Sequence, residues 1–256
     1  MKILYHLFDP TGNITVLVET PVPVERQSAV AAALLRAERA AEQVGFLSAA
    51  EGCDLALRMA GGEFCGNATM SAAAFSALRN GGADGALIIQ VSGAPAPVTV
   101  RLAALPGGWR GTVDMPRPLS VARETLPGGG SRAVVRFPGI AHVIYTETIG
   151  RPAAETAVKR WCAALGAEAM GLMLFDRAAN ILTPLVYVPA GDTLYWEHSC
   201  ASGSAAVGAY LASEAGRPVT AALTEPGGVL TVTAAPGGAV SLTGTVKYLR
   251  KGTVEL

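Results

Sequence analysis

The chain has 256 residues, half of them apolar and 16% charged, which is the composition of a globular protein and not of a disordered one. Twenty basic residues balance twenty acidic ones, and this balance argues against nucleic acid or an anionic membrane as the main partner. We therefore expect one large or two small domains that bind a small molecule, with no nucleic-acid partner and no membrane partner.

The first residues, MKILYHLFDP, become polar at Asp9, before an apolar run long enough for a signal sequence has formed. No stretch approaches the roughly 18 consecutive apolar residues of a membrane span. These features predict a cytoplasmic protein whose four cysteines are reduced. Each cysteine must then be a core residue, a ligand or a reactive thiol.

The N-terminal half begins with apolar runs typical of strands and a helix. The helix is expected from Pro23 to about Gly45, because apolar residues recur at helical spacing and glycine is a common stop. After a strand at 53–59, a glycine-rich loop carries Cys65 and leads into a run of small residues that suits a close-packed helix. The expected elements are strands 3–8 and 14–19, helix 23–45, strand 53–59, helix 68–79, and strands 86–92, 97–104 and 109–114.

The same order of elements recurs in the second half, with a loop that carries Cys200. The expected elements are helix 153–166, strands 171–175 and 181–188, helix 204–214, and strands 219–224, 228–234 and 239–246.

The two cysteine segments can be aligned with each other. FCGNATMSAAAF at 64–75 and SCASGSAAVGAY at 199–210 place cysteine, small residues and a terminal aromatic residue in register, 135 residues apart. This is a two-copy repeat, and the Pro- and Gly-rich stretch Met115–Arg132 is its expected boundary. The sequence therefore predicts an α/β protein of two similar halves.

Cysteine at the start of a helix has a specific chemistry. Unpaired backbone N–H groups and the helix dipole favour negative charge there, so we expect a lowered thiol pKa and a site for a carboxylate. If two such helices face one substrate, one thiolate can remove an α-proton while the opposite thiol delivers a proton to the other face. None of the four lysines lies beside a cysteine loop, which weighs against pyridoxal phosphate, and we expect no cofactor.

At Phe64-Cys65-Gly66-Asn67 and Cys200-Ala201-Ser202-Gly203 the sequence resembles the diaminopimelate epimerase superfamily. That superfamily also includes proline racemases, phenazine-pathway isomerases and the histidine racemases of opine-type metallophore synthesis. Weaker matches lie at Phe8–Asn13, at Gly139–His142 and at Gly244–Leu256, so the resemblance covers essentially the whole chain.

The resemblance implies two pseudo-symmetric domains, each a β-barrel-like sheet around a central helix, with the active site in the cleft between them. The expected domains are 1–114 with a returning strand at 247–256, and 115–246. Cys65 and Cys200 would be the catalytic pair. The substrate-binding residues would be Asn13, Glu63, Gly66, Asn67, Glu197, Ala201, Ser202 and Gly203, while Asn13 could instead be a turn residue.

Departures from the family pattern bear on the substrate. Diaminopimelate epimerases carry Glu-Arg before the second cysteine, whereas this chain has Glu197-His198, so a second carboxylate would be poorly held. Acidic side chains at Glu63 and Glu197 would suit a cationic or hydrogen-bond-donating side chain, although either could be a solvated loop residue. The run Gly-Gly-Glu-Phe-Cys-Gly-Asn most resembles the histidine racemase branch, so conversion of L-histidine to D-histidine is the first choice. Diaminopimelate or another amino acid is the alternative substrate.

The histidines have less specific interpretations than the cysteines, and two other functions fit the same residues. His142 and His198 could support the site from behind, although His142 could equally be a core histidine bonded to backbone, and His6 is expected to be packed or at the surface. His142, His198 and Cys200 fit no closed zinc pattern, so no metal site is expected. A thiol redox sensor and a single-base isomerase of the phenazine type remain alternatives. The sequence leaves open whether the chain forms a homodimer.

Overall fold

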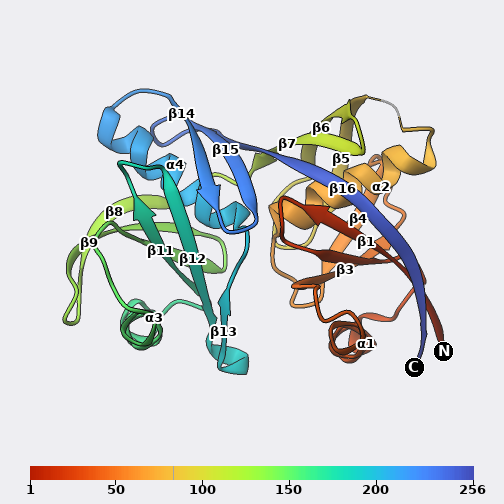
Figure 1. Ribbon diagram of the computed structural model, residues 1–256, viewed down its shortest axis with the longest axis horizontal. Helices are drawn as coiled ribbons and strands as arrows, with labels where there is room; N and C mark the ends of the chain where they lie inside the picture. The colour runs from red at the N-terminus through yellow and green to blue at the C-terminus, as the bar shows by residue number, and fades with distance from the viewer. Residues whose placement is uncertain (83) are drawn as a thin grey trace. The chain divides into compact units, whose positions relative to one another are not determined.

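A computed structural model describes residues 1–82 and 84–256 of the chain. Within these residues no helix has the length and apolar character needed to cross a membrane. The helices and strands are shown in Figure 1. In chain order they are β1 (Lys2–Pro10), β2 (Thr15–Val18), α1 (Val24–Ala37), β3 (Gln43–Ser48), β4 (Leu55–Met59), α2 (Gly66–Arg79), β5 (Gly85–Val91), β6 (Val98–Leu105), β7 (Gly108–Met115), β8 (Ser120–Leu126), β9 (Gly130–Phe137), β10 (Ile140–Tyr145), α3 (Arg151–Leu165), β11 (Met170–Asp176), β12 (Ile181–Val188), η1 (Pro189–Gly191), β13 (Thr193–Trp196), α4 (Ala201–Ala215), β14 (Val219–Glu225), β15 (Gly228–Ala234) and β16 (Val240–Glu255).

The chain divides into two compact units. Unit 1 comprises Met1–Asp114 together with Thr243–Leu256, and unit 2 comprises Met115–Leu242. Unit 2 is therefore one continuous segment, whereas unit 1 is assembled from both ends of the sequence.

The strands of unit 1 form a closed barrel of eight strands. They are hydrogen-bonded in the order β1-β2-β3-β4-β5-β6-β7-β16, and β16 pairs in turn with β1 in antiparallel register from Lys2↔Glu255 to Pro10↔Val246. Helix α2 contacts six of these strands, and every residue from Gly66 to Ala77 is buried. A closed barrel leaves no unpaired strand edge, and α2 supplies its core.

Unit 2 repeats the strand pairing of unit 1. In unit 1 the pairings alternate: β1–β2 is antiparallel, β2–β3 parallel, β3–β4 antiparallel, β4–β5 parallel and β5–β6 antiparallel. In unit 2 the series β9–β10, β10–β11, β11–β12, β12–β14 and β14–β15 alternates in the same way. The predicted α/β fold of two similar halves is confirmed.

Small residues allow α2 and α4 to lie close to the strands around them. A Cβ added at Gly208 of α4 would lie 2.4 Å from Cγ2 of Val232 on β15, and one at Gly111 of β7 would lie 3.2 Å from Sδ of Met70 on α2. The other two helices pack on the outside of the strands: α1 contacts β3, and α3 contacts β11 and β12 (Figure 1).

Two predicted elements were clearly wrong in extent, and several strands were not predicted. The helix expected at 23–45 ends at Ala37, and Gln43–Ser48 is strand β3, in which Val44 pairs with Val16 of β2. The strand expected at 53–59 begins at Leu55, because Cys53 lies in a bend before it. No strand was expected in the stretch 115–132, which contains β8 and the beginning of β9; unit 2 begins at its first residue, Met115.

Candidate active site

Cys65 is the N-cap residue of α2. Its backbone is extended, and its sulfur accepts a hydrogen bond from the backbone N–H of Ala68 at 3.4 Å. Its carbonyl oxygen accepts from both the N–H (2.9 Å) and the hydroxyl (2.7 Å) of Thr69. The thiol thus occupies the position at which serine or aspartate usually satisfies the free N–H groups of a helix.

Cys200 occupies the same position on α4. Its sulfur accepts from the N–H of Gly203, also at 3.4 Å, and its side chain is buried like that of Cys65. Both helices begin one residue after their cysteine, so the 135-residue repeat extends to the geometry of the two thiols. In each case the sulfur lies at the positive end of a helix dipole.

The expectation of a lowered thiol pKa was wrong for Cys200. Burial, the charges of Glu197 and Glu225 and a hydrogen bond from the thiol to Glu197 raise its pKa well above the usual range, and only Ser202 opposes them. Desolvation and two nearby carboxyl groups therefore outweigh the helix dipole. These neighbours hold Cys200 in its protonated, thiol form.

The residues that follow each cysteine form the first turn of the helix. Gly66, Asn67, Ala201 and Gly203 are buried there, and the hydroxyl of Ser202 lies 3.6 Å from the sulfur of Cys200. First-turn N–H groups point out of a helix end and suit a bound carboxylate.

The acidic and imidazole side chains of the two cysteine loops differ in exposure. Glu63 and His198 are exposed, whereas Glu197 is half-buried. The Glu63 carbonyl accepts from Ser92 at 2.9 Å, and the His198 carbonyl accepts from the N–H of Gly227 at 2.7 Å. The Glu197 side chain interacts with the thiol of Cys200.

Asn13 is fully buried after the turn that ends β1. Its side-chain amide donates to Glu42 at 3.0 Å, and the left-handed residues of the turn are Thr11 and Gly12. Asn13 closes this turn, because its N–H donates to the carbonyl of Pro10 at 3.3 Å, but its own backbone is not left-handed. Glu42 was missed because it fell inside the helix expected at 23–45.

His142 lies on β10, completely buried, in a packed group of residues next to Cys200. A Cβ at Gly171 would lie 2.1 Å from Nδ1 of His142 and 2.7 Å from Cε of Met173, and a Cβ at Gly203 would lie 2.3 Å from Sδ of Met173 and 3.1 Å from Sγ of Cys200. Neither ring nitrogen has a hydrogen-bond partner among the described residues, so the expectation of a bond to backbone was wrong. Burial lowers the pKa of His142 to about 3, and the ring is neutral.

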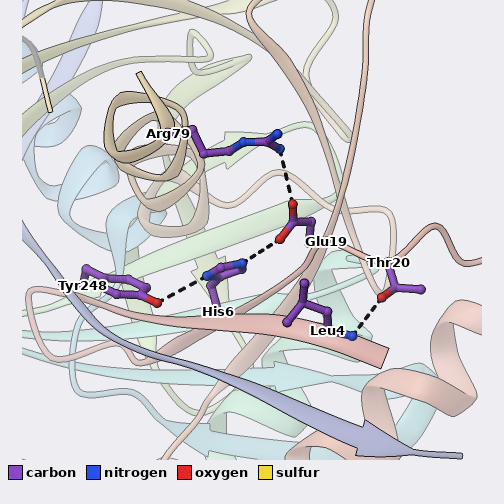
Figure 2. A network of polar contacts seen from close by, with 6 residues as sticks. All are labelled: Leu4, His6, Glu19, Thr20, Arg79 and Tyr248. Carbon is purple, nitrogen blue, oxygen red and sulfur yellow. Dashed lines mark hydrogen bonds and ion pairs between the residues drawn. The ribbon is translucent and has the colours of Figure 1, made fainter. Parts of the chain in front are cut away.

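His6 is packed inside unit 1, as one of the two expected alternatives had it. Figure 2 shows its ring between Glu19, at 2.8 Å, and Tyr248, at 3.5 Å, and Arg79 at the end of α2 completes the chain of contacts through Glu19. Beside it, the hydroxyl of Thr20 accepts from the N–H of Leu4. This network connects β1, α2 and β16.

In the part of the chain that the structure describes, no group of three or more His, Cys, Asp or Glu side chains is placed to hold a metal ion.

Two residues near Cys200 were missed at the sequence level. Glu225 accepts from the N–H of Cys200 at 2.7 Å, and Ser204 donates its hydroxyl to the same carboxyl group. Glu225 directly precedes a Pro-Gly-Gly turn, where an acidic residue is expected to be solvated. No sequence motif or spacing relates it to Cys200.

Comparisons with known proteins identify relatives of this chain. The family model for the histidine racemase CntK N-terminal domain matches residues 2–254. A histidine racemase of Staphylococcus aureus is 29% identical over 90% of this chain and 88% of its own, and one of Fusobacterium nucleatum is 31% identical over 79% of each.

Solved structures share the fold at lower identity. A predicted epimerase of Pseudomonas aeruginosa matches over 99% of each chain with a TM-score of 0.75 and 18% identity. A phenazine biosynthesis protein of the PhzF family from Bacillus anthracis matches over 100% of each chain with a TM-score of 0.74 and 13% identity. A probable proline racemase of Agrobacterium radiobacter, which covers 99% of this chain and 93% of its own, gives 0.71 and 13%. The chain belongs to the histidine racemase CntK family and is an isomerase of the racemase and epimerase type.

Proposed function

We propose that this protein is a cofactor-independent histidine racemase in which Cys65 and Cys200 are the two acid/base groups. The observation that carries the proposal is the matched placement of the two thiols, each as the N-cap of a buried helix with its sulfur on a first-turn N–H. A structural cysteine has no reason to take this position twice.

The chemistry requires both sulfurs to reach one α-carbon. One cysteine, as thiolate, removes the α-proton and becomes a thiol; the other, as thiol, donates its proton to the opposite face and becomes a thiolate. The pair thus exchanges protonation states, no atom is lost, and the product is the mirror image of the substrate. Reaction in the reverse direction restores the first state.

Two features of the site would lower the barrier. First-turn N–H groups at Gly66, Asn67, Ala201 and Ser202 would hold the substrate carboxylate as it gains charge in the planar intermediate. Glu197, hydrogen-bonded to the thiol of Cys200, would hold that thiol in the protonated form from which it donates to the substrate. Asn13 and Glu63 are proposed to contact the rest of the substrate.

Histidine is proposed because the curated relatives with sequence similarity are histidine racemases. Another amino acid of the same reaction class is the alternative. A role in making an opine-type metallophore, implied by the family resemblance, and a cytoplasmic location, expected from the sequence, belong to this proposal.

The test is α-deuterium incorporation in D₂O, with reduced protein and each L-amino acid in turn. With L-histidine, a two-base enzyme gives D-histidine that carries deuterium from the first turnovers, while unreacted L-histidine keeps its proton. Proton NMR measures the deuterium content at the α-carbon, and chiral chromatography measures the ratio of D- to L-histidine. Absence of exchange into every amino acid would refute the function, and exchange into a different one would replace the substrate.

The cysteines are tested by Cys65→Ser and Cys200→Ser. Serine is a preferred N-cap residue, so each variant keeps an acceptor for the helix N–H and should fold, while its hydroxyl is far too weak an acid or base. We expect racemisation to fall at least about a hundredfold in each. Cys53→Ser, at a half-buried cysteine in a bend, is the matched control and should retain activity. Full activity in either N-cap variant would contradict the two-thiol mechanism.

A further inference from the structure

Glu225 lies at the end of β14 and is the one buried Asp or Glu among the residues that the structure describes. Only 3% of its surface is exposed. Both of its oxygens are used at the start of α4. One accepts the backbone N–H of Cys200 at 2.7 Å, and the other is bonded to the hydroxyl of Ser204. Glu225 thus binds the N-cap residue and a residue one turn further on.

This arrangement resembles a capping box in which the acid comes from another strand. In a capping box, the third residue of the helix is Glu or Gln and reaches back to the N–H of the N-cap residue. In α4 that position is Gly203, and a side chain there would collide with Met173, 2.3 Å from the added Cβ. Glu225 provides the missing acceptor from β14.

We propose that Glu225 is a positioning residue for Cys200, holding the thiol in place through the first turn of α4 and setting, by its own charge, how readily that thiol gives up its proton. The proposal rests on the proposed function for its catalytic consequence, but its effect on the thiol can be measured without catalysis.

The charge of Glu225 changes within the working range of an enzyme. Burial, together with the charge of Glu197, raises its pKa to about 8, although hydrogen bonds from Ser204 and Cys200 act in the opposite direction. Near neutral pH the carboxyl group is therefore mostly protonated. Above that pH, Glu225 ionises and places a second negative charge, in addition to that of Glu197, next to the Cys200 thiol. Both carboxyl groups raise the pKa of this thiol.

The experiment compares the full-length protein with Glu225→Gln and Glu225→Leu. Glutamine keeps an oxygen for the N–H of Cys200 and an amide for Ser204 but carries no charge at any pH, whereas leucine removes both contacts. Glu168→Gln is the matched control, because Glu168 is an exposed residue of the same unit.

The first readout is the rate at which iodoacetamide alkylates Cys200 as a function of pH, resolved by peptide mass spectrometry. In Glu225→Gln the midpoint of this reaction should move to lower pH by at least about half a unit, and that of Cys53 should not move. The second is racemisation: the kcat of Glu225→Gln relative to wild type should rise between pH 7 and 9, while Glu225→Leu should lose kcat about tenfold or more with little change in KM.

An unchanged Cys200 midpoint in Glu225→Gln overturns the proposal, whether or not Glu225→Leu folds. If no amino acid is racemised, the alkylation result still shows whether Glu225 affects the thiol. Failure of the proposed function can therefore be distinguished from failure of the proposed role of Glu225. A melting temperature lowered in both variants with no shift of the midpoint would leave Glu225 a purely structural residue.

Discussion

The imidazole of His142 is surrounded by apolar and sulfur-containing neighbours, and this environment determines its ionisation. Burial lowers its pKa from 6.5 to about 3. In the unfolded chain the same ring would take up a proton near its ordinary pKa. Between these two values the unfolded state binds a proton that the folded state does not, so stability is lost as the pH falls.

We predict that His142→Leu removes this part of the acid sensitivity. In wild type, this group should reduce the free energy of unfolding by up to about 1.4 kcal/mol for each pH unit below 6.5. Urea unfolding at pH 7.5, 5.5 and 4.5 measures the slope, which should be shallower in the variant. His198→Asn, at an exposed histidine, should keep the wild-type slope. Equal slopes in His142→Leu and wild type would show that the ring is protonated in the folded state.

At the residue level, the sequence predicted the two N-cap cysteines but not the groups around them. Cys65 and Cys200 stand out because the local sequence around each is similar. Glu225 is hydrogen-bonded to Cys200 from 25 positions away, across a contact between β14 and α4 that no local pattern encodes. The sign of the Cys200 pKa shift was wrong for the same reason: the helix end is a local feature, whereas burial and neighbouring carboxyl groups come from the tertiary structure.

At the level of elements, α4 depends on close approach to β15. Gly208 lies where a Cβ would be 2.4 Å from Cγ2 of Val232, and valine is a stiff, β-branched residue that cannot easily turn away.

We predict that Gly208→Ala destabilises the protein by about 1–3 kcal/mol, despite the better helix propensity of alanine, because overpacking outweighs it. Adding Val232→Ala removes the obstructing methyl groups, so the double variant should be more stable than the sum of the single effects indicates. Denaturant unfolding of the four proteins gives the coupling. Additive effects would mean that α4 can shift away from β15 without cost.

The elements that the sequence predicted well are the ones whose local pattern agrees with their packing. Helices α2 and α4 and strands β12 and β15 lie within a few residues of expectation. The error at 23–45 arose because Val44 continues a helical spacing and Gly45 resembles a helix stop. In the structure Gly45 is inside β3, where a Cβ would lie 2.6 Å from Cδ1 of Leu57. Its lack of a side chain serves packing between strands and not helix termination.

At the level of the whole molecule, the barrel of unit 1 is closed by β16. Tyr248 on this strand lies against Phe8, with ring centroids 5.3 Å apart, and Val254 packs on the core of the unit. Without β16, strand β1 would have an unpaired edge.

We predict that deleting residues 247–256 loosens unit 1 selectively. Hydrogen exchange followed by mass spectrometry should show faster exchange in β1 and β2, whereas β11 and β12, which have no pairing with β16, should change little. Unchanged protection of β1 would mean that β16 contributes little to the stability of the barrel.

The discontinuous make-up of unit 1 also imposes an order on its formation during synthesis. β1 leaves the ribosome before the other strands of unit 1, but its second neighbour, at 243–256, is translated only after the whole of unit 2. A nascent chain that has reached residue 242 therefore contains all of unit 2 but lacks most of β16, the strand that completes the eight-stranded barrel of unit 1. Throughout that interval an apolar strand is open to pairing with other chains, and a slow ribosome would prolong the exposure.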